Sequence, residues 1–328
     1  MLDGDELVWS GSELDELEGI DAVGHRIVHG GTEFVEPVVI DESVVRRIEA
    51  LADLAPLHQP KSLRALELVS AKLPGVPAVA CFDTAFHAAM PAAAATYALP
   101  REWRTRWPLR RFGFHGLSHA YASRRAAELI GAPVEDLRIV TCHLGAGASL
   151  AAVRGGRSVD TTMGFTPLDG LVMATRSGSL DPGLILWLEE HMGMPPSELA
   201  STLEHRSGLV GLAGSADMKA ILERDDEDAR LAVEVYVHRL RREIAAMVAS
   251  LGGLDVLVFT GGVGERAAPI RARAGESLAF LGVEIDARRN EDAQPDADIG
   301  AGSVRVFVIA AREDLEIARG VRSALAFE

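Results

Sequence analysis

The sequence predicts an α/β protein, from the spacing of its apolar residues and from the glycines that bound the apolar segments. Segments rich in β-branched residues have the length of buried strands, and longer segments between them have the apolar spacing of helices. We therefore expect strand–helix–strand crossover units together with at least one hairpin. The expected strands are Ala22–His29, Val76–Phe82, Leu137–Leu144, Ala148–Val153, Leu254–Thr260 and Val304–Ile309.

Two segments between the strands carry clear helix signals. Ser118 is a suitable N-cap for a helix over Ala120–Ile130, and Gly131 is a suitable stop. A second helix ends at Gly252 and Gly253, because glycine readily adopts the left-handed conformation found at helix C-termini. The apolar face of that helix consists of Leu240, Ile244, Met247, Val248 and Leu251.

The hairpin lies near the middle of the chain. The strand Ile139–Leu144 leads into Gly145-Ala-Gly147, the strand Ala148–Val153 follows, and a third short strand covers Ser158–Asp160. Glycines at the tip of such a turn have no Cβ, so backbone N–H groups there can approach phosphate groups closely. The turn is therefore a candidate phosphate-binding element.

Composition limits the classes of partner. The chain has 328 residues, enough for about two domains, and its 48% hydrophobic and 25% charged residues are typical of a globular protein. The net charge of −15 disfavours a nucleic acid partner. The only lysines are Lys61, Lys72 and Lys219, and none follows a glycine, which excludes a Walker P-loop.

The cysteines and the N-terminus indicate the compartment. Cys81 and Cys142 lie in apolar segments, and two cysteines form no disulfide framework, so we expect free thiols in a reducing environment. The first residues are acidic and lack the apolar core of a signal peptide. The alanine-rich stretch before Leu99 is broken by Pro91 and bounded by Pro100, and no segment is apolar enough to span a membrane. We therefore expect a cytoplasmic protein.

Arg26 is a candidate carboxylate-binding residue. On a strand the side chains alternate, so Arg26 shares one face with Val28, while His25, Ile27 and His29 share the other. A guanidinium fork binds a carboxylate or phosphate with two hydrogen bonds. Beside a valine, it suits a small acid with a short apolar tail. An exposed arginine on a sheet edge is the alternative interpretation.

Asp83 and Arg176 stand in similarly unusual contexts. Asp83 ends an apolar strand, at the carboxyl edge where open α/β sheets place their chemistry, although it could simply cap the turn at Thr84. Arg176 lies in the segment Ala174-Thr-Arg-Ser-Gly-Ser-Leu-Asp-Pro182, where a salt bridge to Asp181 is the structural alternative. An arginine suits phosphoryl transfer, because that chemistry needs positive charge around the transferred group.

His115 lies between two glycines that permit close approach of a ligand, Gly113 and Gly116, although most single histidines are core residues. A zinc-dependent hydrolase is a minor alternative, because the i,i+4 spacing of two histidine pairs suits zinc on a helix. The glycines argue against a helix at His115, and no glutamate follows it. The pairs are His115 with His119 and His25 with His29.

Together these segments resemble the acetate kinase family, from about Ala22 to the C-terminus. The resemblance rests on the strings Gly24-His-Arg-Ile-Val-His-Gly-Gly31, Phe82-Asp-Thr-Ala-Phe-His87, Arg111-Phe-Gly-Phe-His-Gly116, Ala174–Pro182, His143-Leu-Gly-Ala-Gly147 and Thr260-Gly-Gly-Val-Gly-Glu265. It implies an actin/hexokinase-like (ribonuclease-H-like) duplicated two-domain α/β fold. The family's opening strand and its Asn-Ala-Gly-Ser-Ser-Ser-Leu-Lys phosphate loop do not precede Ala22 here, so we expect the first domain to be incomplete at its N-terminus.

The resemblance also implies domain boundaries and the residues of the acid-binding side. Residues 1–86 and 313–328 would form the N-terminal lobe with a returning C-terminal helix, and residues 87–312 the nucleotide-binding lobe. In the family the arginine matching Arg26 binds the carboxylate, and the residues matching Asp83, His115 and Arg176 are catalytic. A small pocket for the acyl tail would be lined by Val28, Leu57, Phe114 and Pro167.

The nucleotide side follows from the same resemblance. The residues matching the family's nucleotide contacts are His143, Leu144, Gly145, Ala146, Gly147, Asp217, Met218, Lys219, Gly262, Val263, Gly264, Glu265 and Arg266. Glu313 matches the magnesium-associated glutamate. The chain departs from the family, which usually has asparagine where Ala146 and Arg266 stand and Thr-Asn where Ala311-Arg312 stands. The nucleotide contacts are therefore less firmly predicted than the acid site.

The predicted function is an ATP-dependent acyl kinase. Mg²⁺ would be the cofactor, with Mn²⁺ as an alternative, ATP the co-substrate, and acetate or a similar short acid such as propionate the acceptor. The resemblance implies a homodimer, and the net charge and the lack of a long apolar segment predict no nucleic acid or membrane partner. The alternative is a weakly active or non-catalytic remnant of an acyl kinase, because the first phosphate loop does not precede Ala22.

Overall fold

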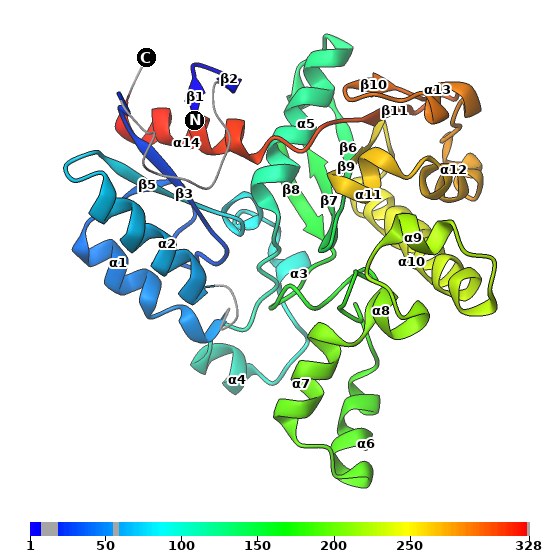
Figure 1. Ribbon diagram of the computed structural model, residues 1–328, viewed down its shortest axis with the longest axis horizontal. Coiled ribbons are helices and arrows are strands. Elements are labelled where there is room, and N and C mark those ends of the chain that lie inside the picture. The colour runs from blue at the N-terminus through cyan, green and yellow to red at the C-terminus, as the bar shows by residue number, and fades with distance from the viewer. Residues whose placement is uncertain (8–18, 55–58, 327–328) are drawn as a thin grey trace.

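A computed structural model describes residues 1–7, 19–54 and 59–326 (Figure 1). The larger of two main sheets has the strand order β10-β11-β9-β6-β7-β8. Within it β11, β9 and β6 are parallel, and the remaining neighbours are antiparallel. Its strands are β6 (Arg138–Leu144), β7 (Ala148–Arg154), β8 (Arg157–Thr161), β9 (Val256–Thr260), β10 (Ala297–Asp298) and β11 (Arg305–Val308).

The smaller sheet has the order β3-β5-β4, in which β3 is parallel and β4 antiparallel to β5. A separate hairpin near the N-terminus pairs two very short strands. The predicted strands are therefore confirmed, with ends that differ by a few residues. These strands are β1 (Leu2–Asp3), β2 (Glu6–Leu7), β3 (Val23–Ile27), β4 (Val38–Val39) and β5 (Ala78–Phe82).

Helices cover both faces of the larger sheet (Figure 1). Alternation along β6 sends Val140, Cys142 and Leu144 to the face covered by α10, and Ile139 to the face covered by α5. The helices are α1 (Glu42–Glu49), α2 (Gln59–Lys72), α3 (Ala92–Ala95), α4 (Arg101–Arg106), α5 (Gly116–Ile130), α6 (Pro182–Met192), α7 (Pro196–His205), α8 (Gly208–Ala213), α9 (Met218–Leu222), α10 (Glu227–Leu251), α11 (Gly261–Arg266), α12 (Ala268–Glu276), α13 (Ala287–Glu291) and α14 (Glu313–Leu325). Single 3₁₀ turns occupy Ala52–Leu54, Ala85–His87, Val134–Asp136 and Ala279–Leu281.

The last helix, α14, packs against the smaller sheet, far from it in sequence (Figure 1). Two glycines permit this close approach. A Cβ at Gly24 of β3 would collide with Ile317, and a Cβ at Gly320 of α14 would lie 2.9 Å from Cys81 Sγ. Residues near the two ends of the chain therefore share one packing unit, although the predicted domain boundaries stay a prediction.

Two helix ends test the sequence signals. Gly252 ends α10 with a φ of 72°, as predicted. The N-cap prediction for Ser118 is wrong, because α5 begins at Gly116 and the N-cap is His115. Ser118 lies inside α5, and its Oγ is 2.7 Å from Nδ1 of His143. The Gly116 N–H is satisfied by the Asp83 carbonyl, so the helix can begin one turn earlier.

The glycine-rich segment directly after β9, Gly261–Arg266, forms the short helix α11. No helix in the described part of the chain combines the length and the apolarity needed to cross a bilayer.

Candidate active site

Arg26, Asp83 and Glu313 form an ion-paired group at the edge of the smaller sheet. β3 and β5 are parallel, with Ile27 opposite Phe82, so Arg26 and Asp83 lie at the same carboxyl edge. Arg26 donates from Nε to Asp83 Oδ1 at 3.0 Å and from Nη2 to Oδ2 at 2.8 Å. Its Nη1 lies 2.7 Å from an oxygen of Glu313, the first residue of α14. A guanidinium has five N–H donors, so groups on Nη1 and Nη2 are left for a ligand.

The charges of this group perturb one another. Burial alone would lower the pKa of Arg26, but the charge and hydrogen bonds of Asp83 and the charge of Glu313 outweigh burial and raise it. Burial raises the pKa of Glu313, against the opposing effect of the Arg26 charge. Glu313 also lies at a helix N-terminus, where the helix dipole favours a negative charge.

His115 is held beside this group by an unusual backbone. It has a φ of 55°, in the left-handed region that non-glycine residues rarely occupy and that often marks functional sites. The next amide, Gly116 N–H, donates to the Asp83 carbonyl at 2.8 Å. A Cβ at Gly116 would collide with that carbonyl. The loop therefore needs glycine here, and it places His115 one residue from the backbone hydrogen bond to Asp83, where the Arg26 charge acts on the His115 ring.

Arg176 reaches the same space from the other side. Its Nη1 donates to the Pro167 carbonyl at 2.7 Å. A Cβ added at Gly147 would lie 2.8 Å from Arg176 Nη2 and 3.2 Å from His115 Nε2. Both side chains therefore face one point at the turn between β6 and β7. Burial lowers the pKa of Arg176, partly offset by the charge of Glu204.

The histidines around His115 form a buried cluster. The rings of His115 and His143 stack with centroids 4.3 Å apart. Burial, then the positive potential of His143, His119, Arg26 and Arg176, lowers the pKa of His115 well below its usual value. Burial, then Arg26, lowers that of His143 to about 4. Neutral rings are therefore the stable form at neutral pH.

The minor zinc alternative fails on these contacts. Nδ1 of His119 is 2.7 Å from Thr141 Oγ1, and its Nε2 is 2.8 Å from Ser149 Oγ, so both nitrogens are occupied. His25 lies on strand β3, where the i,i+4 spacing to His29 does not bring side chains together as it does on a helix. The described residues contain no group of three or more His, Cys, Asp or Glu side chains arranged for a metal.

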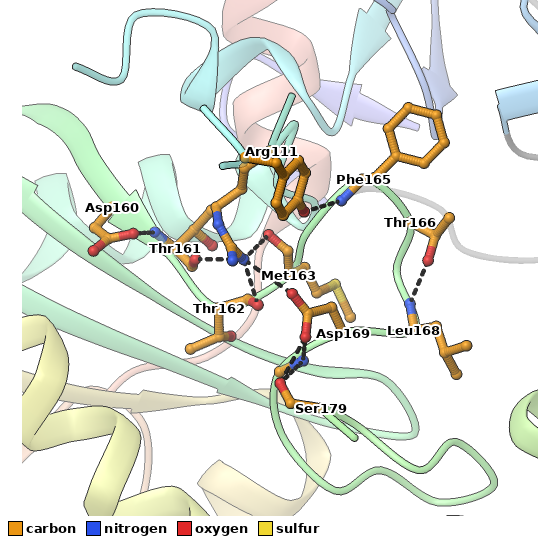
Figure 2. Close-up of polar contacts among 12 residues, drawn as sticks. Arg111, Asp160, Thr161, Thr162, Met163, Phe165, Thr166, Leu168, Asp169 and Ser179 are labelled. Atoms are coloured by element: carbon orange, nitrogen blue, oxygen red, sulfur yellow. Dashed lines mark hydrogen bonds and ion pairs between the residues drawn. The ribbon is translucent and has the colours of Figure 1, made fainter. Parts of the chain in front are cut away.

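Arg111 braces the segment that carries Pro167 (Figure 2). Its Nη1 donates to the carbonyls of Thr162 and Met163 at 2.9 and 3.0 Å and lies 3.3 Å from Asp169 Oδ2. Asp169 Oδ1 in turn accepts a 2.6 Å hydrogen bond from Ser179 Oγ. Because Pro167 holds Arg176, the brace positions Arg176 indirectly.

Three of the four residues predicted to line an acyl pocket lie in the described part of the chain. Phe114 is buried, Val28 packs against the same apolar cluster, and the Pro167 carbonyl contacts Arg176. His29 packs edge-on against Phe114, with ring centroids 5.5 Å apart. Leu57 lies outside the described residues.

The predicted nucleotide segments lie around the ends of β6 and β9. In the first, Ala146 is exposed, and its carbonyl accepts from Ala174 N–H. In the second, Glu265 Oε1 accepts from the N–H groups of Gly261 and Ala311 at 3.0 and 2.9 Å, which ties α11 to the loop before Glu313.

Two further features concern the nucleotide side. A cleft of about 480 Å³ is bordered by Glu265 and Arg266. In the third predicted segment, Asp217 caps α9 and Lys219 is exposed, whereas Met218 is buried in the core.

Sequence reasoning missed the residues that support the site from behind. Arg271 is fully buried and donates to the carbonyls of Gly264 and Glu265, both at 2.9 Å, and to Asn290. Ser149 contacts both His115 and His119. An arginine or serine in an apolar stretch is a weak signal, since its partner cannot be inferred from the sequence.

The chain is similar to known kinases over most of its length. The model of the acetokinase family matches residues 7–319, which begins ahead of Ala22, where the motif resemblance was predicted to start. A protein named acetate kinase from Synechococcus sp. (strain JA-2-3B'a(2-13)) is 50% identical over 321 residues, covering 96% of this chain and 79% of that protein. Another acetate kinase, from Microcystis aeruginosa, is 50% identical and covers 92% and 77%.

Solved structures give the same result. The crystal structure of Porphyromonas gingivalis acetate kinase matches with a TM-score of 0.89 and 39% identity, covering 93% of this chain and 78% of that one. A propionate kinase from Francisella tularensis matches with a TM-score of 0.87 and 40% identity, covering 92% and 78%.

Proposed function

The chain belongs to the acetokinase family, and from this premise we propose that it transfers the γ-phosphoryl group of ATP to acetate or a similar short carboxylate, giving an acyl phosphate and ADP. Its fold is the predicted actin/hexokinase-like α/β fold of that family. The observation that carries the proposal is the convergence of His115 and Arg176 at Gly147, next to the Arg26–Asp83 pair.

The acid would bind through the Arg26 guanidinium. A carboxylate is already ionised at neutral pH, so the reaction needs no general base to activate it. Both oxygens of Asp83 contact Arg26, which supports a positioning role for Asp83 rather than a role in proton transfer. Asp83 would hold the guanidinium in the orientation that the substrate requires.

The reaction is a direct displacement at phosphorus. A carboxylate oxygen forms a bond to the γ-phosphorus as the bond from phosphorus to the bridging oxygen of ADP breaks. Charge spreads over the three equatorial oxygens in the transition state, and catalysis consists mainly of positioning and electrostatic stabilisation. Arg176 and His115 would donate hydrogen bonds to these oxygens.

The acyl tail would contact Val28, Phe114 and Pro167, together with Leu57. A small apolar pocket suits an acid of two or three carbons. One methylene changes binding by only about 1–3 kcal/mol, so we propose that both acetate and propionate are accepted, with acetate as the acceptor in the cell.

Mg²⁺ fits the carboxylates at the site, with Mn²⁺ as an alternative. Mg²⁺ prefers oxygen ligands and commonly takes only one or two protein carboxylates, with waters and substrate phosphates completing its shell. Glu313 would supply that carboxylate, 2.7 Å from Arg26 and next to the loop tied to α11. When bound, the ion would neutralise charge on the β- and γ-phosphates.

ATP would bind along the turn at Gly145–Gly147, the helix α11 and the start of α9. Gly262 at the exposed N-terminus of α11 is open to solvent, with no atom within 4 Å of an added Cβ. Backbone N–H groups at a helix N-terminus favour phosphate. An ATP-dependent enzyme with two free buried cysteines suits the cytoplasm.

The partner is a second copy of this chain. Helix α6 has no buried residue, and it projects with α7 from one side of the molecule (Figure 1). Helix α6 and the residue Leu180 before it expose several large apolar side chains, as protein interfaces often do, namely Leu180, Leu184, Leu186, Trp187 and Met192. Sedimentation velocity should give a species of twice the chain mass for the native protein and a monomer for Trp187→Glu; a monomeric native protein would contradict the homodimer.

The activity is tested by trapping the acyl phosphate with hydroxylamine in the presence of acetate, ATP and Mg²⁺. We expect acetohydroxamate from the native protein, and a loss of at least about 10³-fold in kcat for Arg176→Ala. Arg289→Ala is the matched control, because Arg289 also donates to backbone carbonyls but lies at the far edge of the sheet. A folded, nucleotide-binding protein that forms no hydroxamate would overturn the proposal and favour the non-catalytic alternative.

A further inference from the structure

Three polar side chains connect the interior of the larger sheet to His115. Thr141 Oγ1 on β6 lies 2.7 Å from His119 Nδ1, and His119 Nε2 lies 2.8 Å from Ser149 Oγ on β7. Ser149 Oγ lies 2.9 Å from His115 Nδ1. Thr141, Ser149 and His119 are all fully buried. The row therefore runs without water from the core to the ring that faces Arg176 and Gly147.

Proton counting restricts this row to two arrangements. A hydroxyl has one proton to donate, and a neutral imidazole has one protonated and one bare nitrogen. Ser149 Oγ contacts the two rings and no other described polar group, so accepting from both would leave its own buried proton unsatisfied; it therefore donates to one ring and accepts from the other. Each choice at Ser149 sets which nitrogen is protonated in both histidines. The hydrogen bonds are therefore all donated in one direction, either from Thr141 towards His115 or from His115 towards Thr141.

The two arrangements end differently at Thr141. If the hydrogen bonds are donated towards Thr141, the Thr141 hydroxyl must donate its own proton to the Ala151 carbonyl at 3.5 Å. That distance is well beyond the usual 2.5–3.0 Å of an O–H···O bond. If the row runs from Thr141, the proton lies in the 2.7 Å contact with His119 Nδ1. The second arrangement satisfies every donor from Thr141 to His115 Nδ1 at normal distance, and burial makes an unsatisfied donor costly.

We propose that Ser149 is a positioning residue that holds His115 as a neutral imidazole protonated on Nε2, through hydrogen bonds donated in the order Thr141, His119, Ser149, His115. The inference deepens the proposed function and rests on it for the role of His115. The Nε2 proton then points to the space that Arg176 also faces. His115 acts as a neutral hydrogen-bond donor to the transferred phosphoryl group, with no protonation step.

The surroundings of His115 agree with a neutral ring. The groups that face it are His143, His119, Arg26 and Arg176, and all of them disfavour a further positive charge. An imidazolium at this position would be unstable at neutral pH. An Nε2–H tautomer supplies a donor without that charge.

A second histidine in the same structure provides an internal standard. His87 Nε2 lies 3.0 Å from the Phe114 carbonyl, which only accepts, so His87 carries its proton on Nε2. Its Nδ1 lies 2.7 Å from Ser158 Oγ and must accept from it. The His87–Ser158 pair thus has the geometry inferred for His115 and Ser149, with a direction that its carbonyl partner settles.

The tautomer is measured directly by long-range ¹H–¹⁵N correlation on the full-length protein labelled at histidine, without substrate, between pH 6.5 and 8. Signals are assigned with His115→Gln and His87→Gln. We expect His115 to give the same pattern as His87, with Nε2 protonated and Nδ1 bare. A proton on Nδ1, or on both nitrogens, would overturn the inference even if the protein makes acetyl phosphate. If His115 has the expected tautomer but the protein has no kinase activity, only the proposed function is contradicted.

Three variants separate positioning from structural support. Ser149→Ala should change the His115 nitrogen signals and lower kcat by about 10- to 100-fold, with KM values within about 3-fold. Ser149→Thr keeps the hydroxyl and should restore both. Ser158→Ala, which removes an equally buried serine from a histidine outside the row, should leave kcat and the His115 signals unchanged. Equal losses for Ser149→Ala and Ser158→Ala, or an unchanged His115 spectrum in Ser149→Ala, would contradict the positioning role.

Discussion

Replacing Arg26 by alanine removes the residue proposed to bind the substrate carboxylate, and it also breaks a structural ion pair. Arg26 Nε and Nη2 hold both oxygens of Asp83, and Nη1 contacts Glu313. An activity loss alone would therefore not distinguish binding from stability. The two effects need separate magnitudes and a matched control.

The structure gives a scale for each effect. The Asp83 side chain is 2% exposed, and breaking a fully buried ion pair costs about 3–5 kcal/mol. Because the Arg26 side chain is 40% exposed, solvent screens the pair, and we expect a smaller loss of about 2–3 kcal/mol in the free energy of unfolding. Loss of two hydrogen bonds to a charged substrate costs about 1.5–3 kcal/mol each. Their sum corresponds to about 10²- to 10⁴-fold in kcat/KM for acetate.

Arg138 is the matched control. Its Nε and Nη2 hold both oxygens of Asp255 at 2.9 and 2.6 Å, and its side chain is 39% exposed. Asp255 is 33% exposed, so we expect Arg138→Ala to cost only about 0–1 kcal/mol. Arg138 lies at the start of β6, opposite the end that leads into the turn at Gly147. Its loss should leave kcat/KM within about 2-fold.

The measurements are urea unfolding of both variants and the hydroxamate assay over a range of acetate concentrations. We expect a large loss of kcat/KM in Arg26→Ala under conditions where the variant stays folded. A folded Arg26→Ala enzyme that keeps kcat/KM within about 5-fold would refute the binding role. An equal loss in Arg138→Ala would show that the assay reports stability.

Two further predictions concern pH and the nucleotide side. Burial holds the pKa of His29, His87 and His143 at about 4 in the folded protein, against 6.5 when unfolded, so the unfolded chain binds more protons below pH 6.5. The free energy of unfolding from urea titration should be level from about pH 8 to 7 and fall from about pH 6.5 towards 4, by up to a few kcal/mol per histidine. A free energy of unfolding that stays level down to about pH 4.5 would contradict this. Arg271→Met should raise KM for ATP by about 10-fold or more and KM for acetate little, because Arg271 donates to two carbonyls of α11. Arg273→Met, on the same helix but exposed, should change neither KM. Equal effects of Arg271→Met on both substrates would contradict a specific role of Arg271 in supporting the nucleotide side.

Local sequence patterns predict much of the fold. The strands β5, β6 and β9 are buried on both faces and read as continuous apolar segments, and Gly252 marks the end of α10 by the conformation it adopts. The sequence predicts the wrong start for α5, and the reason is non-local. Its first amide is satisfied by the Asp83 carbonyl, more than thirty residues earlier, rather than by a side chain in its own first turn.

Some residues of the candidate site are likewise predictable from local sequence and others are not. The sequence predicts Arg26, Asp83, His115 and Arg176 because glycines and aromatic residues beside them form distinctive strings. The residues behind them were not, because Ser149 and Arg271 act through partners that only the folded chain brings near. A buried serine in a strand has no local pattern that separates it from ordinary core.

The site depends on contacts between the two sheets. Arg26 and Asp83 come from the smaller sheet, whereas His115 and Arg176 belong to segments packed on the larger one. The direct tie is the hydrogen bond from Gly116 N–H to the Asp83 carbonyl. The left-handed φ of His115 costs about 1–2 kcal/mol, and the hydrogen bond at the next residue offsets part of that cost. His115 and Gly116 therefore join the residues proposed to bind the acid to those proposed to bind the phosphoryl group.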